Sequence, residues 1–301
     1  MQTVAPVGSI AASETTRLLC EGYFTFRHLS QTEVKGISEA IRVHEVTGLG
    51  RLRTHFQLSE QRGFTKFVGR EHERAAMRRA FEQALRGHGQ IVAIVAEAGT
   101  GKSRVVYEFR TTLATECKVL EAYSVSHGKA SAWLPVLELL RSDFGIADAD
   151  DKPTRREKVE AKLAALDSAL NDTLPYLNVL MGLVDGAGPL VQMNPKIRRR
   201  RTLDTLKRIL IRESLDHPLV LIFEDLHWID SETQALLDLL AERIVSARVL
   251  LLVNYRPEYR HEWSGRATTC SSDSTRWGAR TLRQCWRRCS EKAQNSKHPG
   301  A

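Results

Sequence analysis

Uninterrupted runs of apolar residues, many of them β-branched, recur through the second half of the chain. Such runs are typical of strands buried on both faces, as in a parallel sheet. Because helical segments lie between them, we predict a doubly wound α/β domain from about Phe67 to Tyr259. Its predicted strands are Ile91–Val95, Val119–Tyr123, Leu219–Phe223 and Val249–Val253.

Helical periodicity is clearest from Arg70 to Arg86, where Ala75, Ala76, Ala80, Phe81 and Leu85 form one apolar stripe. Two further helix starts are predicted by capping-box spacing, at Thr154–Glu157 and Ser231–Gln234. These helices complete the predicted α/β architecture, a mostly parallel sheet flanked by helices.

Residues 1–50 show a different pattern. Ser13 is placed to cap a helix, and the alternation at 23–26 and 41–44 predicts two half-buried strands. This α+β piece is too short for a well-filled core, so we expect it to be poorly ordered. Residues 51–66 are polar and mixed in charge, and they are interpreted as a linker.

Composition narrows the function classes. The chain has 301 residues with 42% hydrophobic, and no stretch approaches the ~20 apolar residues that cross a bilayer. We therefore expect a cytoplasmic protein without membrane contact. The formal charge is +8, but eight Lys/Arg and two Asp/Glu lie from Trp263 onward, so that tail carries +6. The nearly balanced body predicts no specific nucleic-acid partner.

The candidate chemical site begins at Ala96-Glu97-Ala98-Gly99-Thr100-Gly101-Lys102-Ser103, directly after the first buried strand. It matches the phosphate-binding P-loop except that Ala96 replaces the first glycine. Backbone N–H groups at Gly99, Thr100 and Gly101 are expected to face the phosphates of ATP. Lys102 would neutralise the β and γ oxygens, and Ser103 would ligate Mg²⁺.

A second buried strand ends in Glu224-Asp225, about 120 residues later. Carboxylates at this position are expected to hold the metal's water shell and orient the attacking water. The residues alone do not decide which acid has which role. An alternative is that the two acids only cap the next helix.

Three further features have competing interpretations. Arg256, just past the fourth strand, is placed either to reach the γ-phosphate or to lie exposed in a loop. His227-Trp228 follow the acids; we expect the tryptophan to pack and assign the histidine no catalytic role. Arg198–Arg201 resembles a nucleic-acid patch but is favoured as the solvated first turn of a helix.

Four motifs appear in order: Phe67-Val68-Gly69-Arg70-Glu71, Gly99 through Arg104, Glu224 through Asp230, and Tyr255-Arg256-Pro257-Glu258. Together they resemble the AAA-type ATPase module of the STAND class, over about residues 67–262. The resemblance implies that Phe67 and Val68 lie near the adenine and that Arg104 belongs to the nucleotide site. It also implies that Glu224 is the magnesium-side acid and Asp225 the catalytic one.

The N-terminal piece resembles the last part of a class III adenylate/guanylate cyclase domain, through Ser13–Thr16 and Val34–Val46. That family's metal-binding aspartates have no counterpart in this sequence. The resemblance therefore implies a regulatory ATPase module from a cyclase fusion, and we expect this chain not to cyclise ATP. A DNA-associated ATPase is the alternative from another class; self-association or a protein partner through the ATPase module is expected.

The tail, residues 263–301, follows neither helical nor strand periodicity and is interpreted as disordered or as an out-of-frame translation. Every Cys or Trp codon begins with TG. Shifted back by one base, each becomes NTG, which encodes only Leu, Met or Val. The affected positions are Cys270, Trp277, Cys285, Trp286 and Cys289.

Overall fold

The computed structural model describes residues 5, 7–32, 40–50, 52, 55–61, 63–113, 117–126, 128–184, 189–261, 263 and 268–271. It divides into two compact units, Met1–Phe67 and Val68–Ala301. Most of the tail, and residues 33–39 of the cyclase-like stretch, lie outside the described residues.

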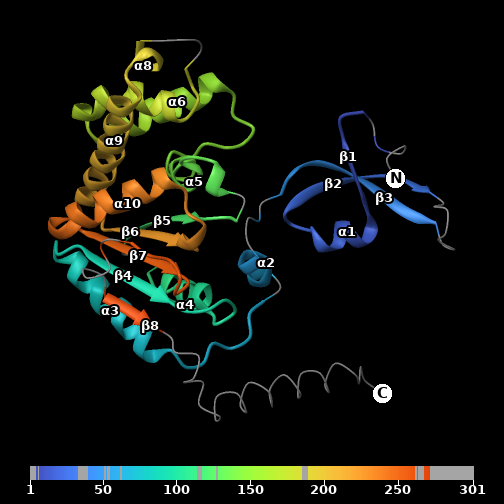
Figure 1. Cartoon of the computed structure of the whole chain (residues 1–301), viewed down its shortest axis with the longest axis horizontal. Coiled ribbons are helices and arrows are strands. Elements are labelled where there is room, and N and C mark those ends of the chain that lie inside the picture. The colour runs from blue at the N-terminus through green and yellow to red at the C-terminus, as the bar shows by residue number, and fades with distance from the viewer. Residues whose placement is uncertain are drawn as a thin grey trace. The chain divides into compact units, whose positions relative to one another are not determined.

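The second unit contains a parallel five-stranded sheet in the order β5-β6-β7-β4-β8 (Figure 1). Its strands are β4 (Gln90–Val95), β5 (Lys118–Tyr123), β6 (Leu219–Glu224), β7 (Val249–Tyr255) and β8 (Thr268–Ser271). The α/β prediction is confirmed, and each predicted strand is present with its end shifted by no more than two residues. Strand β8 lies within residues 263–301, which were interpreted as disordered or out of frame, so the interpretation as disordered is wrong for Thr268–Ser271. Backbone groups on the outer edge of β4 pair with β8 irrespective of side-chain pattern.

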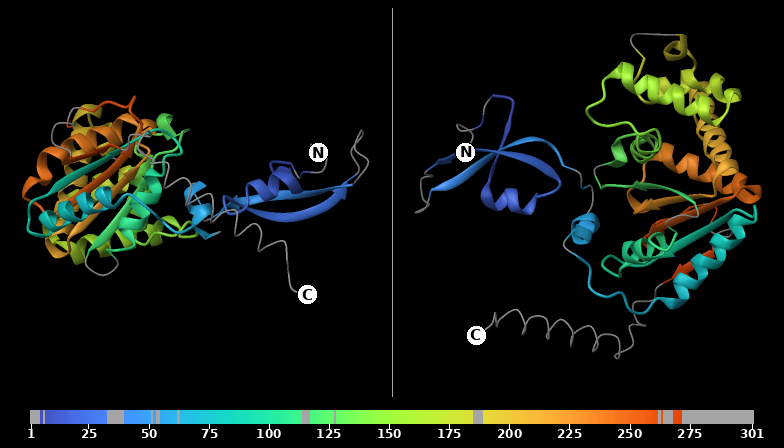
Figure 2. Two further views of the ribbon diagram at one scale, coloured as in Figure 1. Left: turned by 90° about the horizontal axis from the view of Figure 1, so that it is seen from below. Right: turned by 180° about the vertical axis from the view of Figure 1, so that it is seen from behind.

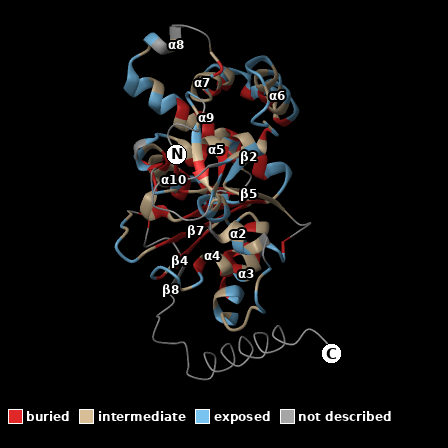
Figure 3. Ribbon diagram, turned by 90° about the vertical axis from the view of Figure 1, so that its right-hand side faces the viewer, coloured by how far each residue is buried: buried red, intermediate tan, exposed pale blue. Residues whose placement is uncertain are grey.

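Helices cover both faces of this sheet (Figure 2). Side chains alternate along each strand, so Ile91 and Ala93 of β4 join the large cluster built with α5, α6, α9 and α10. The residues that alternate with them along β4 face the other side of the sheet, toward α3 and α4. These helices carry the buried rings Phe81 and Phe109. Strands β4, β6 and β7 are thus buried on both faces, as their continuous apolar runs predict (Figure 3), whereas only alternate residues of β5 are buried.

The helices of this unit are, in chain order, α3 (Glu71–Leu85), α4 (Lys102–Arg110), α5 (Leu134–Asp143), α6 (Lys152–Leu166), α7 (Leu174–Leu180), α8 (Pro189–Gln192), α9 (Pro195–Asp216) and α10 (Ser231–Arg243). Short 3-10 turns η1 (Gly128–Ala130), η2 (Ser168–Thr173), η3 (Leu226–Trp228) and η4 (Ile244–Ser246) join them. Among the described residues, no helix is long and apolar enough to cross a membrane.

A helix is present at each of the two predicted capping boxes, but the capping residue differs from the predicted one. Asp151 caps α6 by accepting from the Thr154 backbone N–H at 3.0 Å. Asp230 caps α10 by accepting from Glu232 and Thr233. In both cases a carboxylate precedes the predicted cap and accepts the orphan N–H groups first.

The arginine run 198–201 lies in the first turns of α9, as predicted. Arg199 pairs with Glu232 of α10 at 2.7 Å. Deeper in the unit, the α9 residue Glu213 accepts from Lys118 of β5 at 2.5 Å and from Lys162 of α6 at 3.0 Å. This network ties the helices inserted after β5 to the sheet.

The first unit is a three-stranded antiparallel sheet in the order β1-β3-β2, with the short helix α1. Its elements are β1 (Ile10–Ser13), α1 (Glu14–Leu19), β2 (Phe24–Thr32), β3 (Ile41–Leu49) and α2 (His55–Gln61). Ser13 caps α1 as predicted, since its hydroxyl accepts from the Thr16 N–H. The stretch interpreted as a linker contains α2.

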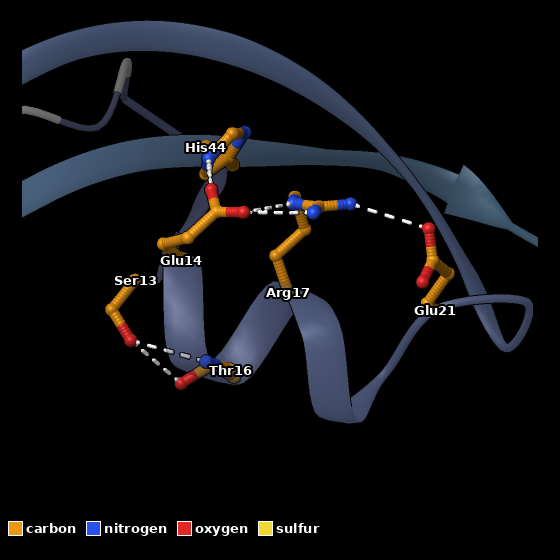
Figure 4. Close-up of polar contacts among 6 residues, drawn as sticks. All are labelled: Ser13, Glu14, Thr16, Arg17, Glu21 and His44. Carbon is orange, nitrogen blue, oxygen red and sulfur yellow. Dashed lines mark hydrogen bonds and ion pairs between the residues drawn. The ribbon is translucent and has the colours of Figure 1, made fainter. Parts of the chain in front are cut away.

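Few residues form the core of this first unit: Ala12, Val43 and Leu52 are its buried apolar residues among those described. Helix α1 buries none of its residues, and Leu18 and Leu19 are exposed. Polar contacts hold the helix instead (Figure 4). Glu14 accepts from His44 of β3 at 2.5 Å and pairs with Arg17 at 2.8 Å.

Candidate functional site

The P-loop connects the carboxyl end of β4 to the first turn of α4. Gly99 and Gly101 adopt φ of 75° and 86°, the left-handed region that favours glycine. Ala96 is buried, and it is not among the described non-glycine residues with positive φ. An alanine at this first P-loop position is therefore free of the strain that a positive φ would impose. Its N–H donates to the Tyr255 carbonyl at 3.3 Å, which joins the loop to β7.

Helix α4 begins at Lys102, and its N-cap Gly101 provides no side-chain cap. The first N–H groups of the helix are thus available to an anion, and the helix dipole favours one there. Lys102 itself is buried and donates to the carbonyls of Ala96 at 2.8 Å and Glu97 at 3.0 Å. Burial lowers the pKa of Lys102, while the nearby Asp225 carboxylate opposes that shift.

Glu224 is the last residue of β6, and its side chain is almost fully buried. It hydrogen-bonds with Ser103 of α4 and accepts from the Asn254 amide at 3.1 Å. Burial raises the pKa of Glu224 to about 7, although both hydrogen bonds oppose that shift. The structure thus brings together the P-loop serine and the strand-end acid.

Asp225 follows Glu224 with φ 58° and ψ 46°, a left-handed conformation that is strained for a non-glycine residue. The Asn254 side-chain oxygen accepts from the Asp225 N–H at 2.9 Å and holds this turn. The Asp225 carboxylate is 44% exposed, so it remains open to solvent or a ligand. One acid is therefore buried beside Ser103, and its neighbour faces outward.

Arg256 lies immediately beyond β7, with its guanidinium 4.0 Å from Glu258. Its charge acts on both Lys102 and His227, which places it within electrostatic range of the P-loop. His227 lies in η3, one turn after β6, with Nδ1 3.9 Å from an Asp225 carboxylate oxygen.

The Phe67–Glu71 box approaches the P-loop through Arg70. Arg70 has φ 65°, and its guanidinium donates to the Thr100 carbonyl at 3.1 Å and pairs with Glu73 at 2.8 Å. Val68, two residues earlier, is half-buried. Arg104 pairs with Glu108 one turn along α4, at 2.6 Å.

These groups suit a magnesium–nucleotide complex chemically. The Ser103 hydroxyl and the Glu224 carboxylate are oxygen donors, the class of ligand that Mg²⁺ prefers. They are supplied by two adjacent elements that already contact one another. Among the described residues no cluster of three His, Cys, Asp or Glu side chains forms a self-contained metal site, so phosphates and waters would complete the coordination.

The AAA ATPase domain pattern matches residues 66–253. This chain belongs to the AAA ATPase domain family. The match includes the P-loop and both acids, and it supports a nucleotide-binding ATPase module.

A further relative is an uncharacterized protein of Rhizobium meliloti (strain 1021), 29% identical over 273 residues. The similarity covers 87% of this chain, so it extends beyond the AAA ATPase domain, but only 25% of the relative. The chain thus spans a quarter of that protein's length. Neither finding bears on the class III cyclase or STAND resemblances, which stay predictions.

The sequence analysis missed Asn254 and the link from Arg70 to Thr100. Asn254 is a polar residue at the end of an otherwise apolar strand, a signal that sequence does provide. For Arg70, only the fold shows that its side chain reaches the AAA domain's P-loop. The roles assigned to Lys102, Asp225 and Arg256 remain predictions, as do those of the predicted nucleotide contacts.

Proposed function

We propose that this AAA ATPase domain binds ATP with Mg²⁺ and hydrolyses it slowly, as a regulatory module of a larger signalling protein. The observation that carries the proposal is the contact chain Ser103–Glu224–Asn254, which joins α4, β6 and β7 beside Lys102. Each member comes from a different segment. A scaffold has no evident need for a buried carboxylate of raised pKa at this position.

Each residue of the site has a proposed role in binding or hydrolysis. The amides of Gly99 to Lys102 and the Lys102 ammonium bind the β and γ phosphates. Ser103 and Glu224 hold Mg²⁺, which supplies charge neutralisation at the phosphates when bound. Asp225, exposed beside the buried acid, orients water, and Arg256 contacts the γ-phosphate.

The regulatory part of the proposal is supported by two features. The relative is about four times the length covered by the match, which leaves room for other domains. The strained turn at Asp225 is fixed by one side chain, Asn254, so a ligand that binds Asp225 acts directly on a backbone under strain.

Titration of the full chain with ATP, in Mg²⁺ and in EDTA, tests the proposal. We expect tighter ATP binding with Mg²⁺. The Glu224→Gln variant should lose much of that metal dependence, and Asp225→Asn should keep binding while turnover falls. Equal ATP affinity with and without Mg²⁺ would show that Ser103 and Glu224 are not metal ligands, and no ATP binding at all would reject the proposed function.

Light scattering with and without ATP tests self-association.

A further inference from the structure

Helices α9 and α10 pack against one another and form a groove with a volume of about 820 Å³ on the surface of the ATPase unit. Each helix contributes one stripe of side chains, at positions 197, 200, 201, 204 and 207 of α9 and 235, 238, 239, 242 and 243 of α10. Positions three and four apart lie on one face of a helix, so the two stripes face the same groove. No residue of the candidate nucleotide site lines it.

The apolar part of the lining is continuous from one helix to the other. Leu203, Ala235 and Leu239 are half-buried, and Leu203 packs against the core beneath. At one end of the groove Ile197 is 53% exposed. A large exposed apolar side chain beside an apolar groove indicates a surface that another apolar surface can cover.

The charged part of the lining has an excess of unpaired arginine. Several charged residues have partners within the described chain: Arg199 with Glu232, Lys207 with Asp204, and Asp238 with the Trp263 indole. The exposed side chains of Arg200, Arg201 and Arg243 make no ion pair or hydrogen bond within the described residues, although the charge of Arg201 reaches Asp172. Glu242 is the acid of the lining in the same state, so three positive charges and one negative charge are open to a ligand.

This combination selects among possible ligands. A small anion would pair with the arginines but leave the apolar lining uncovered. A nucleic-acid backbone would be repelled by the acidic residues on both walls, Asp204, Asp238 and Glu242. An acidic amphipathic helix meets both requirements, because it carries apolar residues on one face and carboxylates beside them.

The length of the groove also suits a helix. The α9 stripe runs from Ile197 to Lys207, which is about 15 Å at the helical rise of about 1.5 Å per residue. Three turns of a docked helix cover that distance. Such a helix presents apolar residues at i, i+3, i+4 and i+7, the spacing by which helices occupy grooves.

We propose that the groove between α9 and α10 docks an acidic amphipathic helix of a partner protein. The apolar stripe of that helix buries Ile197 and Leu239. Its flanking Asp or Glu side chains pair with Arg200, Arg201 and Arg243, since a guanidinium matches a carboxylate with two parallel hydrogen bonds. Docking here requires no nucleotide, so it is separate from the ATP hydrolysis proposed above.

Fluorescence anisotropy of a labelled peptide titrated with the full chain tests the proposal. The probe is two repeats of the heptad Leu-Glu-Glu-Leu-Leu-Glu-Glu, which places leucines on one helix face. A scrambled peptide of the same composition has the same charge but no apolar stripe, and it should bind at least about tenfold more weakly. Replacing every glutamate of the probe with lysine should abolish binding, because the unpaired arginines repel it.

Substitutions at exposed positions locate the binding surface without disturbing the core. Arg201→Glu and Arg243→Glu should each weaken binding of the probe about 3- to 10-fold, and the double variant about 10- to 100-fold, because attraction becomes repulsion. Ile197→Glu should weaken it at least about fivefold, since the apolar contact is lost. Arg86→Glu makes the same charge change at an exposed position on α3 and should stay within about twofold of wild type. Circular dichroism checks that all four variants are folded.

Each remaining outcome overturns the proposal. Equal binding of the ordered and scrambled peptides would show attraction by charge alone. Unchanged affinity in the folded double variant, or an equal loss in Arg86→Glu, would place the binding outside the groove. A single-stranded oligonucleotide that displaces the probe and binds more tightly would assign the arginines to nucleic acid instead.

Discussion

Asn254 links the two acidic residues of the site to the neighbouring strand. Its amide donates to Glu224 and its oxygen accepts from the Asp225 N–H, so one side chain serves both neighbours. At 1% exposure, neither bond is readily replaced by water. The position of each acid thus depends on a residue about 30 positions away in the chain.

Lys102→Ala tests the phosphate site at this scale. Removing the ammonium should weaken ATP binding about 10- to 100-fold, because charge-assisted hydrogen bonds are worth about 1.5–3 kcal/mol. Isothermal titration measures the change. Lys207→Ala is the matched control, since Lys207 pairs with Asp204 on α9 and should leave the affinity unchanged. Equal affinity in Lys102→Ala and wild type would contradict the assignment.

The Glu14 carboxylate makes the first unit acid-sensitive. Hydrogen bonding to Arg17 is the main cause that lowers the pKa of Glu14 to about 2, with His44 contributing (Figure 4). A lowered folded-state pKa adds stability above the ordinary value near 4.5, and that stability is lost as pH falls from 4.5 toward 2. We expect Glu14→Gln to destabilise residues 10–49 at pH 7 but not near pH 2.

Pulse-labelling hydrogen exchange along a urea gradient measures this difference within the first unit alone. If the first unit is equally stable in wild type and in Glu14→Gln at pH 7, the Glu14 contacts contribute nothing to its stability. The same experiment tests the prediction that residues 1–50 are poorly ordered.

At the scale of elements, the start of β4 fits against η4 with no space for a side chain. A Cβ on Gly89 would lie 1.9 Å from the backbone oxygen of Ile244. Gly87 in the same turn has open space but a φ of +84°. Packing therefore restricts the residue at Gly89, and backbone conformation restricts the residue at Gly87.

Alanine substitutions distinguish these two restrictions. Gly89→Ala should cost about 3 kcal/mol, because backbone must move to relieve the overlap. Gly87→Ala should cost about 1 kcal/mol from the left-handed φ alone. Urea denaturation followed by circular dichroism measures both. A larger loss in Gly87→Ala would mean that β4 and η4 do not pack as described.

At the scale of the whole molecule, the two units differ in how they are stabilised. The AAA ATPase unit has a continuous core on both faces of its sheet, whereas the first unit buries few apolar residues and relies on polar contacts. Each unit therefore has its own conditions of unfolding, and denaturation of the full chain should not be treated as two-state.

The prediction that the tail, residues 263–301, is translated out of frame concerns the gene as well as the chain. In the frame shifted back by one base, Cys270 in the β8 stretch becomes Leu, Met or Val. Positions 285, 286 and 289 also become apolar, at helical spacing. Sequencing the gene decides the matter: a stop codon in that frame within a few codons of Trp263 would contradict the idea.

The sequence by itself determined strands β4 to β7, the P-loop and the two acids, because each is a contiguous pattern whose physical cause is local. Buried parallel strands require continuous apolar runs, and the phosphate loop requires glycines at positive φ. The acids were found because carboxyl ends of parallel strands meet at one edge of the sheet.

Only the tertiary structure decided which side chains meet. The bond from Asn254 to Glu224 depends on β7 lying beside β6, and the bond from Arg70 to Thr100 depends on α3 reaching the loop. His227 is buried with neither ring nitrogen bonded in the described part of the chain, a feature that becomes visible only once burial is known. These contacts join residues 30 positions apart, or depend on exclusion of water, and no local periodicity encodes either.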